Sequence, residues 1–253
     1  MKLLAFETAT EACSVALWID GEVIERHSLA PRRHAEFALP WAEELLNEAG
    51  IRRAQLDAIA VGRGPGAFTG VRLAVALSQG IALALDIPVL PISTLAVLAA
   101  GSRSLMTRTT QNIAVNDARI LAAIDARMGE IYLGGFALAP DGDVTALGAE
   151  LLAPPQQLID WRGLLESGTP MPPSEQQRWL GTGTGFAASD AALVATLGPS
   201  LLHYDSSALP HASDLARLAV AAHVRGDAVG ADQVEPAYLR NKVALTLLEQ
   251  GKR

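Results

Sequence analysis

The stretch that decides the fold is MKLLAFETATEACSVALWIDGEVIERHSL, residues 1–29. It contains three short apolar runs, Leu3 to Phe6, Cys13 to Ile19 and Val23 to Leu29. The second and third runs are joined at Asp20-Gly21, a dipeptide that suits a tight hairpin turn. The chain therefore opens with three predicted strands, of which the last two form a hairpin.

Helices and strands alternate after this opening. Residues from Arg32 to Ala49 show helical periodicity, and Gly50 follows at the position where a left-handed C-cap is expected. A predicted strand from Ala58 to Val61 is followed by a glycine-rich loop and a second helix, and Ile87 to Ile92 forms a further strand. Three meandering strands followed by alternating helices and strands indicate an α/β, ribonuclease-H-like lobe with a mixed sheet flanked by helices.

A polar stretch divides the chain in two. Residues 102–112 are polar, and predicted strands and helices follow them. We therefore expect an N-terminal lobe of residues 1–108 and a smaller C-terminal lobe of residues 109–253, whose last helix is a candidate for packing back on the first lobe.

The composition limits the classes of function. Of 253 residues, 50% are hydrophobic and 19% are charged, which excludes overall disorder. A net charge of −7 makes nucleic-acid binding by this chain alone unfavourable, because such binding neutralises phosphates. The single Cys13 excludes a disulfide framework and fits a reducing, cytoplasmic setting. The longest uncharged apolar run, Leu73 to Leu85, is shorter than the ~20 residues that span a bilayer, so no membrane association is expected.

Two neighbouring helices carry more apolar surface than one sheet needs. The apolar positions of residues 35–49 fill about half of a helical wheel, whereas burial against a sheet needs a stripe of roughly 100°. Between Val71 and Leu85 the only polar residues are Arg72, Ser78 and Gln79. Either the rest of the chain covers this surface, or it forms a homodimeric or heterodimeric interface, which we favour. The residues expected at the interface are His34, Phe37, Ala38, Trp41, Leu45, Phe68, Arg72, Val75, Ala76, Gln79, Gly80 and Leu83.

Glycine-rich loops and polar strand ends give a weaker signal for a nucleotide or anion cleft. The glycines are explained equally well as turns that allow close packing, and the polar residues as solvated ends of strands. The five histidines show no H-x-x-x-H spacing, and no serine stands in a nucleophile elbow, so no metal, cofactor or catalytic residue is expected. The candidate cleft residues are Glu7, Thr8, Thr10, Gly64, Gly66, Asp125, Arg127 and Gly183.

The chain contains five characteristic segments in this order: LLAFETAT (3–10), HAEFALP (34–40), GPGAFTGVR (64–72), DARMGEIY (125–132) and PAYLR (236–240). They resemble segments of the TsaB family of bacterial proteins, which belongs to the threonylcarbamoyladenosine pathway of tRNA modification. The resemblance covers most of the chain and implies two actin-like, sugar-kinase-like lobes that are paralogous to the catalytic subunit TsaD. Glu7, Ala9 and Ala67 depart from the family pattern and weaken the case for phosphate or magnesium binding.

The resemblance also implies a function. In TsaD an H-x-x-x-H helix holds the metal, and here Thr94 and Leu98 take the two ligand positions, neither of which replaces imidazole. The chain is thus expected not to be an enzyme but to act as a scaffold and activator of TsaD. The pair, with TsaE, would transfer threonylcarbamoyl to N6 of adenosine 37 in tRNAs reading codons that begin with A. We expect a homodimer when it is alone and tRNA contact mainly through its partners.

A rival interpretation is an enzyme in its own right. It would be a metallopeptidase-like, glycoprotease-related protein or a small actin-like ATPase. Such an enzyme needs a metal or nucleotide held by Glu7, Asp125 and the glycine loops.

Overall fold

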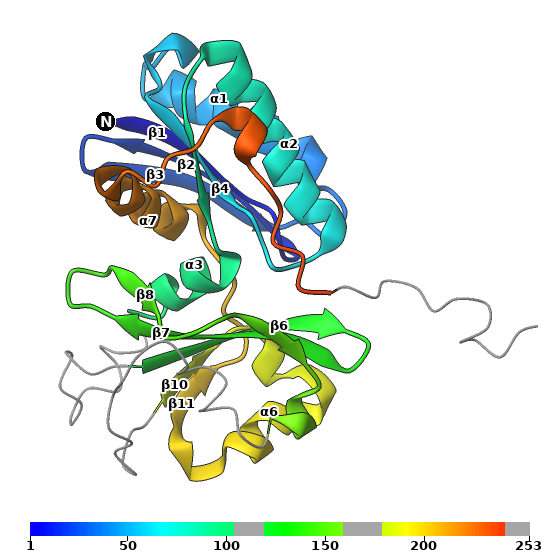
Figure 1. The fold of residues 1–253 in the computed structure, drawn as a ribbon. Coiled ribbons are helices and arrows are strands. Elements are labelled where there is room, and N and C mark those ends of the chain that lie inside the picture. Colours follow the sequence, from blue (N-terminus) through cyan, green and yellow to red (C-terminus); the bar gives the residue numbers. More distant parts are fainter. Residues whose placement is uncertain (104–118, 159–178, 241–253) are drawn as a thin grey trace, which may run out of the picture.

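The computed structural model describes residues 1–103, 119–158 and 179–240, which form two lobes with one mixed sheet each (Figure 1). The first sheet has the order β3-β2-β1-β4-β5. Its strands β1, β2 and β3 pair antiparallel, and β4 and β5 run parallel to β1, which confirms the predicted ribonuclease-H-like order. These strands are β1 (Lys2–Glu7), β2 (Ala12–Ile19), β3 (Glu22–Leu29), β4 (Ala58–Gly62) and β5 (Val89–Ile92).

The second sheet repeats this plan. Its order is β11-β10-β6-β7-β8, with β9 also paired to β7. Because β8 and β9 contact successive parts of β7, together they take the place that β3 has in the first sheet. The strands are β6 (Arg119–Arg127), β7 (Glu130–Leu138), β8 (Val144–Ala146), β9 (Leu151–Ala153), β10 (Trp179–Thr182) and β11 (Leu201–Asp205).

Helices cover both faces of each sheet, and alternate strand residues supply the core on each side. On β1, Leu4 and Phe6 face α1 (His34–Glu48) and α2 (Phe68–Leu85), while Leu3 and Ala5 face α7 (Ala212–Arg225). On β6, even-numbered positions such as Ile120 face α3 (Thr94–Gly101), and odd-numbered ones such as Leu121 face α6 (Ala188–Leu197).

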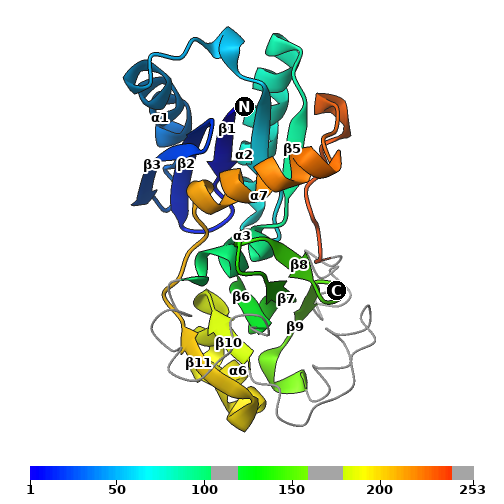
Figure 2. The same ribbon diagram turned by 90° about the vertical axis from the view of Figure 1, so that its left-hand side faces the viewer.

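Two of these helices cross between the lobes. Although α3 follows the first sheet in the chain, it packs on β6 and β7, and although α7 follows the second sheet, it packs on β1 and β2. Both lie between the two sheets, and each contacts the other (Figure 2). The expected division at 108/109 falls in residues outside the described part of the chain and stays a prediction, but α3 and α7 pack across it.

Helix α2 is longer than its uncharged run suggested. It extends from Phe68 to Leu85 and has the length and composition of a membrane-crossing helix, with a third of its residues buried. Arg72 limits the uncharged run to Leu73 to Leu85, so the sequence alone predicted no such segment. A single helix of this kind is weak evidence for a membrane, since core helices meet the same criteria.

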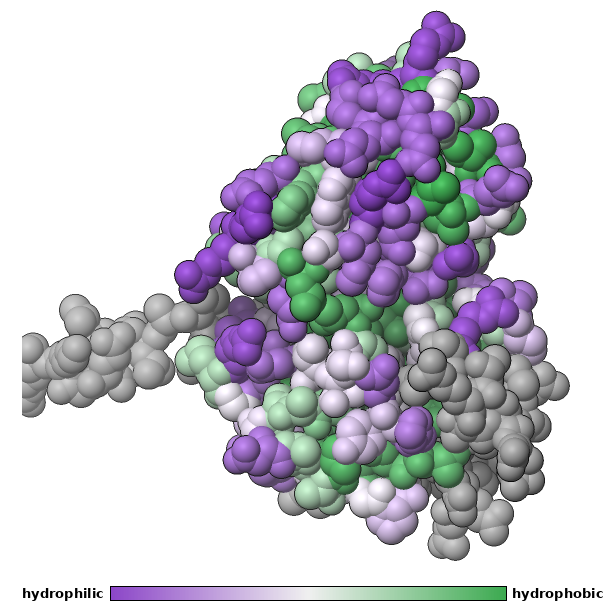
Figure 3. All heavy atoms as spheres, turned by 180° about the vertical axis from the view of Figure 1, so that it is seen from behind, coloured by the Kyte–Doolittle hydropathy of each residue, from purple (hydrophilic) through white to green (hydrophobic). Residues whose placement is uncertain are grey.

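Apolar surface gathers where the lobes meet. On the side opposite to that of Figure 1, green residues form a band at this junction, and most of the surface above it is hydrophilic (Figure 3).

Candidate functional site

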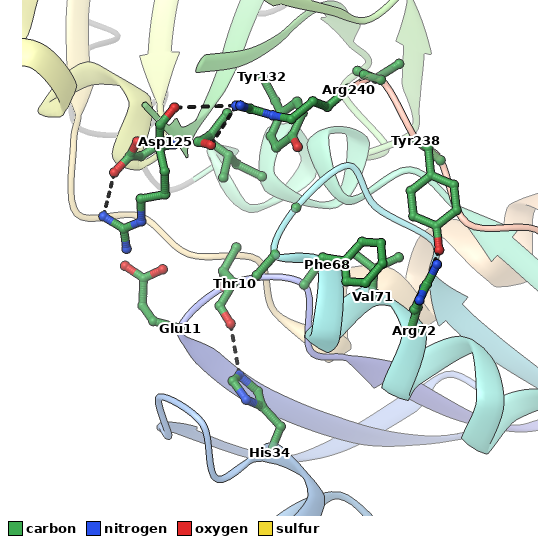
Figure 4. Close-up of a pocket in the computed structure, with 18 of the residues that line it drawn as sticks. Thr10, Glu11, His34, Phe68, Val71, Arg72, Asp125, Tyr132, Tyr238 and Arg240 are labelled. Carbon is green, nitrogen blue, oxygen red and sulfur yellow. Dashed lines mark hydrogen bonds and ion pairs between the residues drawn. The ribbon is translucent and has the colours of Figure 1, made fainter. Parts of the chain in front are cut away.

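A cavity of about 770 Å³ lies between the two lobes. Its walls come from the β1–β2 connection, the start of α1 and the turn before it, the first turn of α2, the β6–β7 turn and residues 237–240 (Figure 4). Four of the predicted cleft residues line it, namely Thr10, Gly66, Asp125 and Arg127. Three predicted interface residues, His34, Phe68 and Arg72, line it as well.

The first lobe contributes a fixed imidazole and an aromatic ring. The Nε2 atom of His34 lies 2.9 Å from the carbonyl oxygen of Thr10. Because a carbonyl only accepts hydrogen bonds, Nε2 is the donor in this contact. The Phe68 side chain, half exposed, stands at the mouth of the cavity in the first turn of α2 (Figure 4).

Residues 234–240, here called the strap, connect the two lobes. On the first lobe, the Gln79 amide donates to the Val234 carbonyl at 3.2 Å and the Arg72 Nε donates to the Tyr238 hydroxyl at 2.6 Å. On the second lobe, the Arg240 guanidinium pairs with Glu130 at 2.8 Å and donates to the carbonyl oxygen of residue 126 at 2.9 Å. The cavity is therefore closed on one side by a segment anchored to both lobes.

The cavity lining is more basic than the chain as a whole. Four arginines line it, Arg32, Arg72, Arg127 and Arg240, against two acidic residues, Glu11 and Asp125. Arg127 pairs with Asp125 at 2.7 Å and Arg240 with Glu130. Among the described residues, Arg32 and Arg72 form no ion pair, and the only hydrogen bond of the Arg72 side chain goes to the neutral Tyr238. The lining thus keeps an excess of positive charge.

Glu7 lies inside the first lobe and not in the cavity. Its side chain is 1% exposed, and it accepts hydrogen bonds from the Ala9 N–H at 2.8 Å and the Thr94 hydroxyl at 3.1 Å. Burial raises the pKa of this carboxyl to about 7, against the lowering effect of these bonds. The neighbouring Thr8 is also buried, and its hydroxyl donates to the Gly70 carbonyl. The prediction that Glu7 and Thr8 line a cleft is therefore wrong, because both are bonded within the core.

The glycine loops serve close packing. A Cβ atom on Gly66 would lie 2.3 Å from the Ala9 carbonyl oxygen, and one on Gly183 would lie 2.2 Å from the Ala123 oxygen. Gly64 has a φ of +94° and donates its N–H to the Thr94 hydroxyl. Neither Gly64 nor Gly183 lines the cavity, so the structural interpretation of these two glycines is the one the contacts support.

Thr94 and Leu98, the two positions that the resemblance assigns to the TsaD metal ligands, are core residues. Thr94 connects Gly64 to Glu7, and the Leu98 side chain packs in the core between α3 and the second sheet. Within residues 1–103, 119–158 and 179–240, no group of three or more His, Cys, Asp or Glu side chains is placed to hold a metal ion. Cys13 is buried, and burial raises the pKa of its thiol to about 12.

The outer side of α2 carries the exposed part of the predicted interface. Its members recur every three or four residues and form one line along the helix, here called the α2 ridge. Leu83 is 78% exposed and Phe68 50%. On α1, the half-buried Phe37 and Trp41 rings stack on each other at 4.9 Å. The α2 ridge consists of Phe68, Arg72, Ala76, Gly80 and Leu83.

Three residues predicted for the interface face the core instead. Ala38 and Leu45 on α1 and Val75 on α2 are buried against the first sheet. Gln79 is half-buried beneath the strap. The helical wheel counted apolar residues around the whole helix and so included those that the sheet itself covers.

The cavity also has lining residues that the sequence analysis did not assign. Those with polar side chains include Arg32, Tyr132, Tyr238 and Arg240. Tyr132 stands in the DARMGEIY segment, and Tyr238 and Arg240 stand in the closing PAYLR segment, so these motifs were the available signal. Arg32 had none, because its role depends on how the lobes meet.

Two ribonuclease-H-like lobes around a central cavity define the class of actin-like proteins. Comparison with known families is consistent with this class: a family model described as TsaD, tRNA N6-adenosine threonylcarbamoyltransferase, matches residues 25–247. A solved structure described as YeaZ from Pseudomonas aeruginosa superimposes with a TM-score of 0.78 at 40% identity, covering 94% of this chain and 99% of that one.

Curated relatives narrow the class to a family. The Escherichia coli tRNA threonylcarbamoyladenosine biosynthesis protein TsaB is 36% identical over 249 residues, 96% of each chain. The Haemophilus influenzae protein of the same name is 34% identical over 96% of this chain and 95% of that relative. The chain belongs to the TsaB family.

Proposed function

We propose that this chain takes part in tRNA threonylcarbamoyladenosine biosynthesis as a scaffold and activator of a TsaD subunit and is not itself the catalyst. Its membership of the TsaB family and the match to the TsaD family model support the pathway and the kinship with TsaD. The pair, together with TsaE, would transfer threonylcarbamoyl to N6 of adenosine 37 in tRNA.

The observation that carries this proposal is the α2 ridge. This helix of 18 residues has Phe68, Ala76, Gly80 and Leu83 on its outer side, with Arg72 as the one charge. The strap contacts it at Phe68 and Arg72 through Tyr238, and Ala76, Gly80 and Leu83 are exposed. The small residues in its centre allow a second helix to approach closely. Such a line of apolar and small side chains fits a helix–helix interface with TsaD or, when TsaD is absent, with a second copy of this chain.

The buried network supports an accessory role. Glu7, the acidic residue that a nucleotide or metal site would use, is bonded to Thr94 and the backbone inside the core. The net charge of −7 supports leaving most tRNA contacts to partner subunits. The rival enzyme requires Glu7 to face the cleft, and no contact in the described residues favours that arrangement.

The test is co-elution of this chain with TsaD on size-exclusion chromatography. Gly80→Glu or Ala76→Glu should abolish the complex, because each places a charge in the centre of the α2 ridge without touching the core. The matched control is Val224→Glu, which puts the same charge on an exposed apolar position of α7, on the other face of the first sheet, and should leave the complex intact.

Two outcomes would contradict the proposal. One is co-elution of the folded Gly80→Glu variant with TsaD, its fold being checked by circular dichroism. The other is stoichiometric binding of ATP or a metal ion to the purified chain with catalytic turnover in the absence of TsaD, which would favour the enzyme.

A further inference from the structure

We propose that the cavity between the lobes is a binding site for a small organic anion that carries an aromatic or acyl body. Phe68 and Arg72 belong both to the cavity lining and to one end of the α2 ridge, but binding in the cavity does not require the proposed function. It follows from the size, the charge and the lining of the cavity.

The size fits a small molecule. A volume of about 770 Å³ lies within the roughly 300–1,000 Å³ that is typical of ligand sites. The walls belong to both lobes and to the strap, and their main polar groups are tied in place. His34 is fixed to Thr10, and Arg240 is fixed to Glu130 and to the β6–β7 turn.

The charge selects an anion. Arg127 and Arg240 are neutralised by Asp125 and Glu130. Arg32 and Arg72 have no carboxylate partner among the described residues, and Glu11 is the one further acidic residue of the lining. In a chain with a net charge of −7, a cavity with unneutralised guanidinium groups is therefore suited to a carboxylate, sulfonate or phosphate.

The remaining lining selects an aromatic or acyl body. The apolar side chains of Val71, Ile124 and Leu239 belong to the walls, together with the rings of Phe68, Tyr132 and Tyr238 (Figure 4). Phe68 and Tyr238 lie 5.9 Å apart, and the Arg72 guanidinium lies 3.7 Å from the centre of the Phe68 ring. A planar group bound here finds aromatic faces beside the cation that holds its negative charge.

The experiment uses the fluorescent anion anilinonaphthalene sulfonate and its uncharged analogue phenylnaphthylamine, each titrated into the full chain. We expect one sulfonate site per chain. Arg32→Gln should weaken the sulfonate by about fivefold, as expected for a lost charged contact, and leave the uncharged analogue unchanged. Arg32→Lys should restore most of the affinity. Ala126→Trp should abolish binding of both probes, because a large side chain on the second-lobe wall fills the cavity.

Matched controls locate the site. Arg53→Gln removes an exposed arginine far from the cavity, and Leu83→Ala trims the α2 ridge, so neither should change the affinity. Equal affinity in wild type, Arg32→Gln and Ala126→Trp, or a loss of binding in Leu83→Ala, would overturn the proposal. Thermal unfolding of each variant separates loss of the site from loss of the fold.

Discussion

At the scale of single residues, Gly62 makes room for a buried acid. A Cβ atom on Gly62 would lie 1.9 Å from one Glu7 carboxylate oxygen. Glu7 in turn accepts the Ala9 N–H and the Thr94 hydroxyl proton, and the Thr94 oxygen accepts the Gly64 N–H. The strand end, the glycine loop and the start of α3 are thus held together by one carboxyl group.

This arrangement predicts a strong interaction between positions 62 and 7. Gly62→Ala should lower the free energy of unfolding by about 3 kcal/mol through overpacking, and Glu7→Ala by about 2 kcal/mol through unsatisfied polar groups. In the double variant the methyl group of the alanine at position 62 has room, because the Glu7 carboxylate is gone. The loss of unfolding free energy in the double variant should therefore be close to that of Glu7→Ala alone. Urea unfolding measures all three values.

The control for this pair is Gly80→Ala. Nothing lies within 4 Å of a Cβ at Gly80, so the variant should gain about 0.5–1 kcal/mol from helix propensity. Strictly additive losses in the double variant would show that the two residues do not share the same space.

The sequence reveals these residues unevenly. Helical spacing alone exposes Phe68, Ala76 and Leu83 on one line of α2, and the structure has them exposed. Helical spacing does not reveal that Glu7 is buried. Its burial depends on the space left by Gly62, a residue without a side chain in another strand. Ala38, Leu45 and Val75 were misassigned for a similar reason, since a wheel shows which residues share a side but not where the sheet lies.

At the scale of secondary structure, α7 is capped by the first sheet. The helix has no side-chain cap of its own, and the Ser14 hydroxyl accepts from the Ala212 N–H at 2.9 Å. Glu25 accepts from the Ser213 N–H at 3.1 Å and lies 3.2 Å from His211 Nδ1. A helix from the end of the chain is therefore fixed by β2 and β3, and its position is coupled to the ionisation of Glu25 and His211.

The stability contributed by this pair should depend on pH. Burial raises the pKa of Glu25, but the bonds from His211, Ser14 and Ser213 outweigh it and hold that pKa at about 2. The hydrogen bond to Glu25 raises the pKa of His211, against burial. The His211 part is complete below about pH 6.5 and is lost as the pH rises through its raised pKa. The Glu25 part is complete above about pH 4.5 and is lost as the pH falls toward 2.

The stabilisation by the pair should therefore be largest between about pH 4.5 and 6.5. It is measured as the difference in unfolding free energy between wild type and Glu25→Gln. NMR titration should show a lower pKa for His211 in this variant. Burial and the His211 charge lower the pKa of His27, which stacks on His211 at 4.0 Å, whereas Glu25 raises it, so the His27 contribution also differs between the two proteins. Glu22→Gln on the same strand is the control, and a difference that does not vary with pH would contradict the coupling.

At the scale of the whole molecule, the lobes are joined twice. Helices α3 and α7 are exchanged between the sheets, and the strap crosses on the other side of the cavity. The Arg240 side chain is the strap's anchor on the second lobe, where it also approaches the Met128 sulfur. The shape of the cavity thus depends on a few polar contacts as well as on the packed helices.

Arg240→Gln should loosen the lobes without unfolding either one. The lost ion pair and carbonyl bonds should cost about 1–3 kcal/mol. Spin labels placed at positions 44 and 203, one on each lobe, should give a broader distance distribution in Arg240→Gln than in the wild type. Pulsed electron paramagnetic resonance measures this distribution. The buried Cys13 should stay unlabelled. Arg217→Gln, which breaks an ion pair within α7, is the control, and an unchanged distribution in Arg240→Gln would show that the helices alone set the lobe angle.

The fold class was accessible from the sequence, because strand order and hairpin signals are local. The exchange of α3 and α7 was not, since both are apolar helices that would suit either sheet. The cavity was only partly accessible. Thr10, Gly66, Asp125 and Arg127 were named, but the walls come from five separate segments whose meeting is set by the exchange and the strap.

The exchange of helices also determines how the chain can be shortened. A fragment that stops after the first half would lack α7 and leave Leu3, Ala5 and Ala60 open to water, while the complementary fragment would lack the cover that α3 gives to Ile120 and Ile124. Each fragment would expose an apolar face of its sheet, the kind of surface that drives aggregation. The smallest unit that can be expressed in soluble form is therefore expected to include both halves together.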